Sequence, residues 1–419
     1  MTDRTPPGRT WAGTHEFRAA ELLVPATIAE AQELVAARDR IRSLGTRHSF
    51  NDLADTPGSL LALTGIAPDV VIDTDARTVT VGAGTRYAVV ASELAARGWA
   101  LHNLGSLPHI SVGGATATAT HGSGDHNGNL STAVRALEFI APDGSLRAVR
   151  SGDADFAGSV VHLGALGPVT RVTLAIEPGY RARQDTYEGL TWDDLFDRLD
   201  VVTGAGYSVS VFTTWDTPTV GNIWVKERVG EASAPDMVPT LLSARRRAEK
   251  ALSPTGEEAD NTTEQGGAIG DWHERLPHFR IDATPSNGDE IQTEYLVDRA
   301  VAVDAIRAVR SIAGRVAPAL LVTELRTVAA DELWLSTAYG RDSLCIHFTW
   351  RNLPDAVAAA IVEVERVLAP FDPRPHWGKL FAMPIGASFP RLGDFRELVA
   401  RTDPAGKFRG PYLERVLRV

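Results

Sequence analysis

The sequence holds one cysteine, Cys345, in 419 residues. A single cysteine excludes an intrachain disulfide, a thiolate zinc cluster and a cysteine-ligated iron–sulfur centre. Long apolar runs are also absent, since no stretch reaches the ~18 uninterrupted apolar residues of a membrane-spanning helix. The N-terminal Met-Thr-Asp-Arg-Thr-Pro-Pro has no apolar core for a secretory signal. We therefore expect a cytoplasmic protein without a membrane partner.

An excess of positive charge is lacking as well. The chain carries 42 Lys and Arg against 53 Asp and Glu, which gives a formal net charge of -11. This balance disfavours binding to nucleic acid, because such binding requires a basic face. A local basic pocket for a small molecule is still compatible with it. The length exceeds what one hydrophobic core usually organises, so we expect two domains in a monomeric chain.

The common nucleotide motifs are missing. Gly82-Ala83-Gly84 continues as Thr-Arg-Tyr, so the third glycine of a dinucleotide fingerprint is absent, and there is no Walker loop. Four histidines lie between residues 102 and 126, but their spacing matches no metal-binding motif, and we expect no metal. These absences disfavour the usual dinucleotide-binding fold and a metalloenzyme.

Local patterns predict an α+β chain with many short strands in its first half. Thr27 and Glu30 form a capping box at the start of a helix. Residues 103–128 are rich in Gly, Thr, Ser and His, and we expect them to form an extended loop system. In the second half, strands are expected at Leu320–Val328 and Leu344–Trp350.

Two loops of small and polar residues, Gly45–Phe50 and Ser111–Gly122, are candidates for a ligand cradle. Backbone N–H groups in such loops can bind a pyrophosphate, and small side chains let a large planar ligand lie against the backbone. The alternative is a tightly packed loop without a ligand. In the first loop, Arg47 and Ser49 flank His48. Its imidazole is a candidate for covalent attachment to a flavin, and an ordinary solvated histidine is the alternative.

Polar residues alternate along the two expected strands of the second half. Glu324 and Arg326 share one face of the first strand, while Cys345, His347 and Thr349 share one face of the second. An acid, a guanidinium, an imidazole and a hydroxyl on inward faces suit a polyhydroxylated substrate. The alternative is a surface ion pair between the acid and the guanidinium.

A late lysine, Lys379, lies in the segment His376-Trp377-Gly378-Lys379. A neighbouring arginine would lower the pKa of this lysine, because like charges disfavour protonation, and the lysine would then be able to act as a base. The alternative is an exposed lysine without a chemical role.

Taken in order, these segments resemble the alditol oxidases, which belong to the vanillyl-alcohol-oxidase superfamily of FAD enzymes. The likeness spans nearly the whole chain, although the broader superfamily loops are shared with sugar-lactone oxidases. It rests on the segments Trp11-Ala12-Gly13, Gly45–Asn51, Ser106–Gly114, His121–Gly124, Gly164–Gly167, Glu324-x-Arg326, His347-x-Thr349, His376–Lys379 and Asp403–Phe408.

The resemblance implies a two-domain α+β fold. A vanillyl-alcohol-oxidase-type (PCMH-type) FAD-binding domain is expected at residues 12–178 and an α+β substrate (cap) domain at residues 179–375. The C-terminal segment, residues 376–419, is expected to return to the FAD domain.

The resemblance also implies an FAD that is attached covalently through His48 alone. Related enzymes that link the flavin through both His and Cys do not fit, because the first half of the chain has no cysteine. Pro168 stands where an aliphatic residue is expected, which leaves the backbone contact at Val169 open. The implied FAD-binding residues are His48, Gly45, Thr46, Arg47, Ser49, Ser106, Ser111, Gly113, Gly114, Thr118, Ala119, Thr120, His121, Val169 and His376.

The reaction implied by the resemblance is oxidation of a terminal primary alcohol of an alditol, such as xylitol or sorbitol, to the aldose. Hydride passes to flavin N5, and O2 is reduced to H2O2. Lys379, Arg326 and Glu324 are the implied catalytic residues, and the substrate pocket is lined by Ser106, Glu324, Arg326, Thr349, Lys379 and His347. The alternatives are an aldonolactone oxidase or dehydrogenase of the same fold, acting on gulono- or arabinono-lactone, and a carbohydrate-binding protein without redox chemistry.

Overall fold

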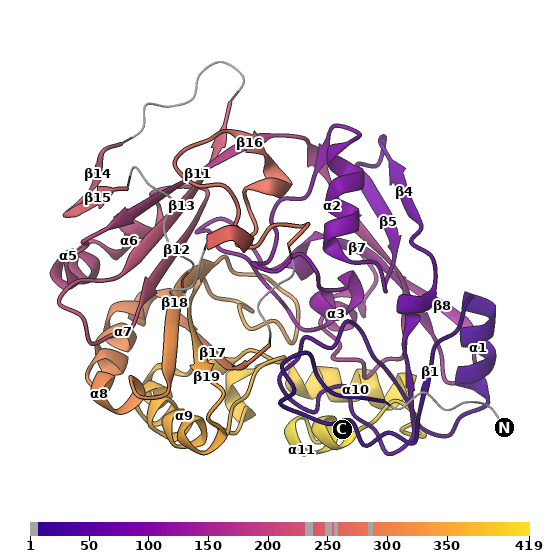
Figure 1. The fold of residues 1–419 in the computed structure, drawn as a ribbon. Coiled ribbons are helices and arrows are strands. Elements are labelled where there is room, and N and C mark those ends of the chain that lie inside the picture. The colour runs from indigo at the N-terminus through magenta and orange to yellow at the C-terminus, as the bar shows by residue number, and fades with distance from the viewer. Residues whose placement is uncertain (1–6, 231–237, 248–253, 255–258, 284–287) are drawn as a thin grey trace.

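The computed structural model of the chain describes residues 7–230, 238–247, 254, 259–283 and 288–419. Within this part, strands of the first half and a large sheet of the second half stand side by side, and the C-terminal helices pack beneath the first half (Figure 1). Among these residues, no helix combines the length and apolar content needed to cross a membrane.

The first half contains a small parallel sheet next to an antiparallel one. The parallel sheet has the order β1-β3-β2, with bounds Glu21–Leu23, Ser59–Leu61 and Ile41–Ser43. The antiparallel sheet has the order β4-β5-β9-β7-β8, with bounds Val70–Asp73, Thr78–Gly82, Val169–Ala175, Val134–Ile140 and Leu146–Arg150. The helices of this half are α1 (Ile28–Ala36), α2 (Tyr87–Ala95), α3 (Val112–Ala117) and α4 (Phe156–Val160).

Helix α3 corrects the expectation of an extended loop throughout residues 103–128. Glycine and threonine have low helix propensity, but tertiary contacts outweigh it here. The N–H of Gly113 donates to the carbonyl of Ala83 at 2.9 Å. A Cβ on Gly113 would lie 2.8 Å from the Cβ of Ala83, so only glycine permits this close approach.

The second half forms one antiparallel sheet. Its order is β14-β15-β11-β13-β12-β18-β19-β17-β20, and β16 pairs with β11. The bounds from β11 to β20 are Arg181–Glu188, Ser208–Thr213, Asn222–Val229, Thr240–Leu241, Ala244–Arg246, Gly270–Asp271, Glu290–Asp298, Leu320–Val328, Ser343–Arg351 and Arg374–Pro375. A short two-stranded sheet, β6 (Trp99–Ala100) with β10 (Glu177–Pro178), lies at the junction of the two halves.

The two faces of the large sheet differ in chemistry. One face packs against helices on the outside of the molecule (Figure 1) and buries residues such as Leu325, Ile346 and Phe348 in a hydrophobic core. The opposite face carries Glu324 and Arg326, so the alternation expected for this strand is confirmed. The covering helices are α5 (Trp192–Asp197), α6 (Leu199–Thr203), α7 (Ala302–Arg310), α8 (Ala313–Val316) and α9 (Pro354–Leu368).

The C-terminal helices α10 (Leu392–Thr402) and α11 (Pro411–Val416) pack in the hydrophobic core of the first half. Backbone hydrogen bonds join the same parts of the chain. The N–H of Ile41 donates to the carbonyl of Lys407 at 3.0 Å, and the N–H of Phe50 donates to the carbonyl of Gly378 at 2.7 Å. The end of the chain is thereby held against the loop that contains His48.

The capping box at helix α1 is confirmed. Thr27 Oγ1 accepts a hydrogen bond from the Glu30 N–H at 3.1 Å, and Glu30 Oε2 accepts one from the Ala26 N–H at 2.8 Å. The first bond satisfies an N–H group of the first helical turn, whereas the return bond from Glu30 goes to the residue before the N-cap and not to Thr27 itself.

We expect Glu30→Ala to lower the free energy of unfolding by about 0.5–1 kcal/mol relative to Glu33→Ala, because only Glu30 closes the cap. Glu33 is exposed on the same helix, so the control makes the same chemical change at the same level of exposure. Urea unfolding followed by circular dichroism measures the difference. Equal losses for the two variants would show that the cap contributes nothing.

Candidate active site

A cavity of about 360 Å³ lies between the small-residue loops of the first half and the polar face of the large sheet. All but one of the residues expected to bind FAD or substrate, or to take part in catalysis, line it. The exception is Ala119, which is fully buried, has a φ of +54° and does not line the cavity. The wall includes Gly45, Thr46, Arg47, His48, Ser49, Ser106, Ser111, Gly113, Gly114, Thr118, Thr120, His121, Val169, Glu324, Arg326, His347, Thr349, His376 and Lys379.

The two small-residue loops meet along one side of this cavity. Thr46 Oγ1 accepts a hydrogen bond from the Ser111 N–H at 3.1 Å. A Cβ on Gly45 would lie 2.7 Å from Ser111 Oγ, so the loops are in close contact here and a larger residue would displace the serine hydroxyl. Small side chains on both loops leave the backbone open toward the cavity, which suits a large planar ligand.

His48 projects into the cavity from the first loop. Its Nδ1 lies 3.0 Å from Thr46 Oγ1, and its ring stacks on Trp11 with centroids 5.4 Å apart. Burial, with a further contribution from the charge of Lys379, lowers the pKa of His48 to about 4. The imidazole is therefore neutral near pH 7.

The other ring nitrogen of His48, Nε2, is buried and has no hydrogen-bond partner. Orphaned buried polar atoms of this kind are rare in folded proteins and call for an explanation. A neutral, nucleophilic imidazole beside a cradle of small residues fits a covalently bound flavin. The residues present are therefore compatible with FAD at this site.

Glu324 and Arg326 of β18 form a buried pair, with Arg326 Nε 3.6 Å from Glu324 Oε1. Their residual exposures are 7% and 6%, so the alternative of a surface ion pair is wrong. Burial alone would raise the pKa of Glu324, but Arg326 and His278 outweigh it and hold that pKa well below its usual range. Glu324 is thus ionised and serves as a hydrogen-bond acceptor.

Glu294 of β17 was not singled out from the sequence, yet three buried side chains make polar contacts with its carboxylate. Its carboxylate lies 2.5 Å from His121 Nε2 and 2.8 Å from His347 Nδ1, and it accepts a hydrogen bond from Cys345 Sγ at 3.0 Å. A local signal existed, because Glu290, Gln292 and Glu294 alternate along one strand.

His121, Glu294 and Cys345 each have one possible metal-ligand atom, and these three atoms lie within 4.8 Å of one another. Such a spacing could indicate a metal site. The hydrogen bonds to Glu294 account for the arrangement. Burial raises the pKa of the Cys345 thiol well above its usual value, so this thiol is protonated and is a poor metal ligand.

Lys379 lies at the edge of the cavity, where its ammonium donates to Gln292 Oε1 and lies 4.7 Å from the ring centre of Phe50. Its pKa is lowered, as the sequence suggested. The main cause is burial, however, and the charge of Arg326 adds to it while Glu294 opposes it. The Lys379 backbone is fixed by Asn51, whose Nδ2 donates to the Lys379 carbonyl at 2.8 Å.

The remaining polar groups complete the wall. Arg326 donates to Ser106 Oγ at 3.4 Å, and Thr349 Oγ1 lies 3.3 Å from His347 Nε2. His278, an isolated loop histidine without a sequence signal, also reaches the cavity, with its Nε2 2.7 Å from Glu324 Oε1. Fixed donors and acceptors therefore surround the space opposite His48.

Two segments of the chain match known protein families. Residues 19–150 match the FAD binding domain, and residues 284–416 match D-arabinono-1,4-lactone oxidase. An alditol oxidase from a Streptomyces species is 45% identical over 414 residues, which cover 97% of this chain and 98% of that protein. The L-gulono-1,4-lactone dehydrogenase of Mycobacterium tuberculosis is 28% identical over 432 residues, with coverage of 97% and 98%.

The fold is also that of a solved cholesterol oxidase from B. sterolicum. The TM-score is 0.77 at 16% identity, over 98% of this chain and 96% of the other. Together with the FAD-binding match, this likeness confirms the expected vanillyl-alcohol-oxidase-type fold. Because the identity with the Streptomyces enzyme extends over almost the whole length of both proteins, the chain belongs to the alditol oxidase family of FAD-dependent oxidases.

Proposed function

We propose that this enzyme oxidises the terminal primary alcohol of alditols, such as xylitol and sorbitol, to the corresponding aldose. The observation that carries the proposal is the buried polar face of β18 and β19, with the ionised pair Glu324 and Arg326, which lines the same cavity as His48. A charged wall of fixed donors and acceptors suits a polyhydroxylated substrate, because each hydroxyl that leaves water then finds a partner.

Residues at the substrate end have separable roles in this proposal. Lys379, with its lowered pKa, accepts the proton of the C1 hydroxyl, and the guanidinium of Arg326 stabilises the charge that develops on that oxygen. Glu324, Ser106 and Thr349 hydrogen-bond the other hydroxyls. Bound FAD supplies the hydride acceptor and the route by which two electrons reach O2, which becomes H2O2.

The proposed position of the cofactor is based on the two small-residue loops. We propose that FAD is attached through His48 alone and lies along Gly45–Ser49 and Ser111–His121, with Val169 and His376 also in contact. The unpartnered Nε2 of His48 and the narrow glycine contacts support this assignment. Residues 12–178 then form the FAD domain, residues 179–375 the substrate domain, and residues 376–419 the segment that returns to FAD.

An aldonolactone oxidase or dehydrogenase is the second candidate. The match of residues 284–416 to D-arabinono-1,4-lactone oxidase favours it, since that region includes Glu324, Arg326 and Lys379. Peroxide production on xylitol compared with that on gulono- and arabinono-lactone distinguishes the two. Efficient dye reduction combined with poor use of O2 would indicate a dehydrogenase.

The covalent link predicts that flavin absorbance stays with the protein after acid precipitation. His48→Ala should release the flavin into the supernatant, because the imidazole is the attachment point. Ser49→Ala, the neighbouring control on the same loop, should retain it. Complete release of flavin from the unmodified protein would contradict the attachment through His48.

Loss of the proposed base predicts slower chemistry. Lys379→Met should reduce the rate of anaerobic flavin reduction by xylitol by about 10²-fold or more, the scale of general-base catalysis. In the unmodified enzyme that rate should rise with pH through the lowered pKa of Lys379, since only the unprotonated amine accepts a proton. Stopped-flow absorbance measures both effects. A variant with near-normal reduction and an unchanged pH profile would remove Lys379 from this role.

A further inference from the structure

A second buried lysine, Lys226, lies behind the substrate wall. It comes from β13 and is 1% exposed. Its ammonium donates to the carbonyls of Leu276 and Pro277 at 2.5 and 2.9 Å and lies 3.1 Å from Nδ1 of His278. The residues opposite it on β11 and β12, Gln184 and Ser208, are uncharged. Among the described residues, the hydrogen-bond partners of the Lys226 ammonium are therefore two carbonyls and an imidazole rather than a carboxylate.

The three acceptors around Lys226 account for all three of its protons. An ammonium can only donate, so His278 Nδ1 must accept. Burial, reinforced by the charge of Lys226, lowers the pKa of His278 to about 4, and the ring is neutral near pH 7. A neutral imidazole that accepts at Nδ1 carries its proton on Nε2.

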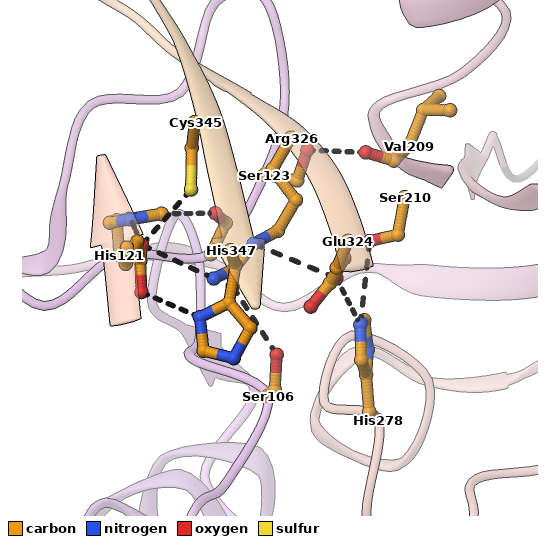
Figure 2. A network of polar contacts seen from close by, with 12 residues as sticks. Ser106, His121, Ser123, Val209, Ser210, His278, Glu324, Arg326, Cys345 and His347 are labelled. Carbon is orange, nitrogen blue, oxygen red and sulfur yellow. Dashed lines mark hydrogen bonds and ion pairs between the residues drawn. The ribbon is translucent and has the colours of Figure 1, made fainter. Parts of the chain in front are cut away.

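That proton is directed at the substrate wall. His278 Nε2 lies 2.7 Å from Glu324 Oε1, so the imidazole donates to the carboxylate (Figure 2). The edges of Phe212 and Trp224 hold the ring, with centroids 5.8 and 5.0 Å from that of His278. A continuous chain of hydrogen bonds thus runs from the Lys226 ammonium to the Glu324 carboxylate.

The same loop also fixes a second group of the wall. The backbone N–H groups of His278 and Phe279 both donate to the carbonyl of Ser106, at 3.0 and 3.1 Å. Ser106 and Glu324 lie on different halves of the molecule, and this loop joins them. The loop behind the wall therefore acts together with Arg326 in fixing the separation between Ser106 and Glu324.

We propose that Lys226 and His278 are positioning residues which hold Glu324 as a fixed acceptor for a substrate hydroxyl remote from the reacting carbon, and thereby set the preference for longer alditols over short alcohols. The inference rests on the proposed function. Neither the Lys226 ammonium nor its neighbours on β13 line the cavity, so Lys226 acts only through His278.

The arrangement requires a charged lysine. A neutral amine has two donors, so one carbonyl would lose its partner or His278 would have to move its proton to Nδ1 and present a lone pair to Glu324. Burial lowers the pKa of Lys226 to about 7, while Glu324 opposes the shift and Arg326 adds to it. The arrangement is complete below this pKa and is lost as the pH rises through it.

The test compares kcat/KM for xylitol with kcat/KM for glycerol in the FAD-loaded enzyme between pH 6 and 9. Taking the ratio cancels the ionisation of Lys379, which both substrates share. We expect Lys226→Met to lower the ratio by about 10- to 100-fold near pH 6, the scale of a buried hydrogen bond to a charged group. The ratio of the unmodified enzyme should fall as the pH rises, while that of the variant stays flat.

Lys407→Met is the matched control. Lys407 donates to three backbone carbonyls, those of Val35, Ala36 and Pro142, at 2.8, 3.4 and 2.6 Å, and it does not line the cavity. This variant also removes a carbonyl-capping ammonium, but the xylitol-to-glycerol ratio and its pH dependence should not change. A fall equal to that of Lys226→Met would mean that general destabilisation is responsible, which overturns the inference.

Two substitutions of His278 test the same chain of hydrogen bonds at the loop residue. They also keep the inference testable if the Lys226→Met variant does not fold. His278→Leu should lower the ratio, whereas His278→Gln, whose amide both accepts and donates, should retain most of it. Glu324→Gln should lower the ratio by itself, and Lys226→Met should then add no further loss, because both changes interrupt one chain of hydrogen bonds.

The outcomes separate this inference from the proposed function. An enzyme active on alditols whose ratio is unchanged in Lys226→Met and His278→Leu overturns the inference alone. An additional loss from Lys226→Met in the Glu324→Gln background also overturns it. A loaded, unmodified enzyme that produces no peroxide from any alditol overturns the proposed function and the inference with it.

Discussion

The burial of two carboxylates, Glu294 and Glu324, is the constraint on which the rest of the structure depends. An ionised carboxylate that leaves water loses several kcal/mol of solvation unless partners replace it. Arg326 and His278 compensate Glu324, and His121 is among the groups that compensate Glu294. These partners come from the large sheet, a loop and the small-residue segment, so the charged wall exists only when all three are assembled.

A single antiparallel sheet provides both the core and the reactive surface. Side chains of β18 and β19 alternate, which places Leu325 and Phe348 in the apolar layer under the helices and Arg326 and His347 on the cavity. A slip of one residue in the pairing would exchange the two faces. The apolar face therefore fixes the register, and the register fixes which polar groups meet the substrate.

Local sequence signals predicted the loops and strand faces of this site, because small-residue runs and alternation need no knowledge of the rest of the fold. The sequence did not indicate Glu294, because the importance of this residue arises from its contact with His121, 173 residues away in sequence. His278 is one histidine in a loop, and only the positions of Lys226 and Glu324 give it a role. Helix α3 was missed because the packing of Gly113 outweighs propensity. In each of these cases, the information that the local sequence lacked was a contact with a residue far away along the chain.

The two chemical ends of the cavity are coupled through the backbone. Two residues beyond the proposed flavin attachment at His48, the Phe50 N–H donates to the carbonyl of Gly378, and the Asn51 side chain donates to those of Trp377 and Lys379. Hydride transfer needs reacting atoms within roughly 3–3.5 Å. Because the same loop fixes the flavin attachment and the backbone of the proposed base, their separation does not depend on the flexible lysine side chain alone. This coupling requires that the C-terminal segment return to the first half of the chain.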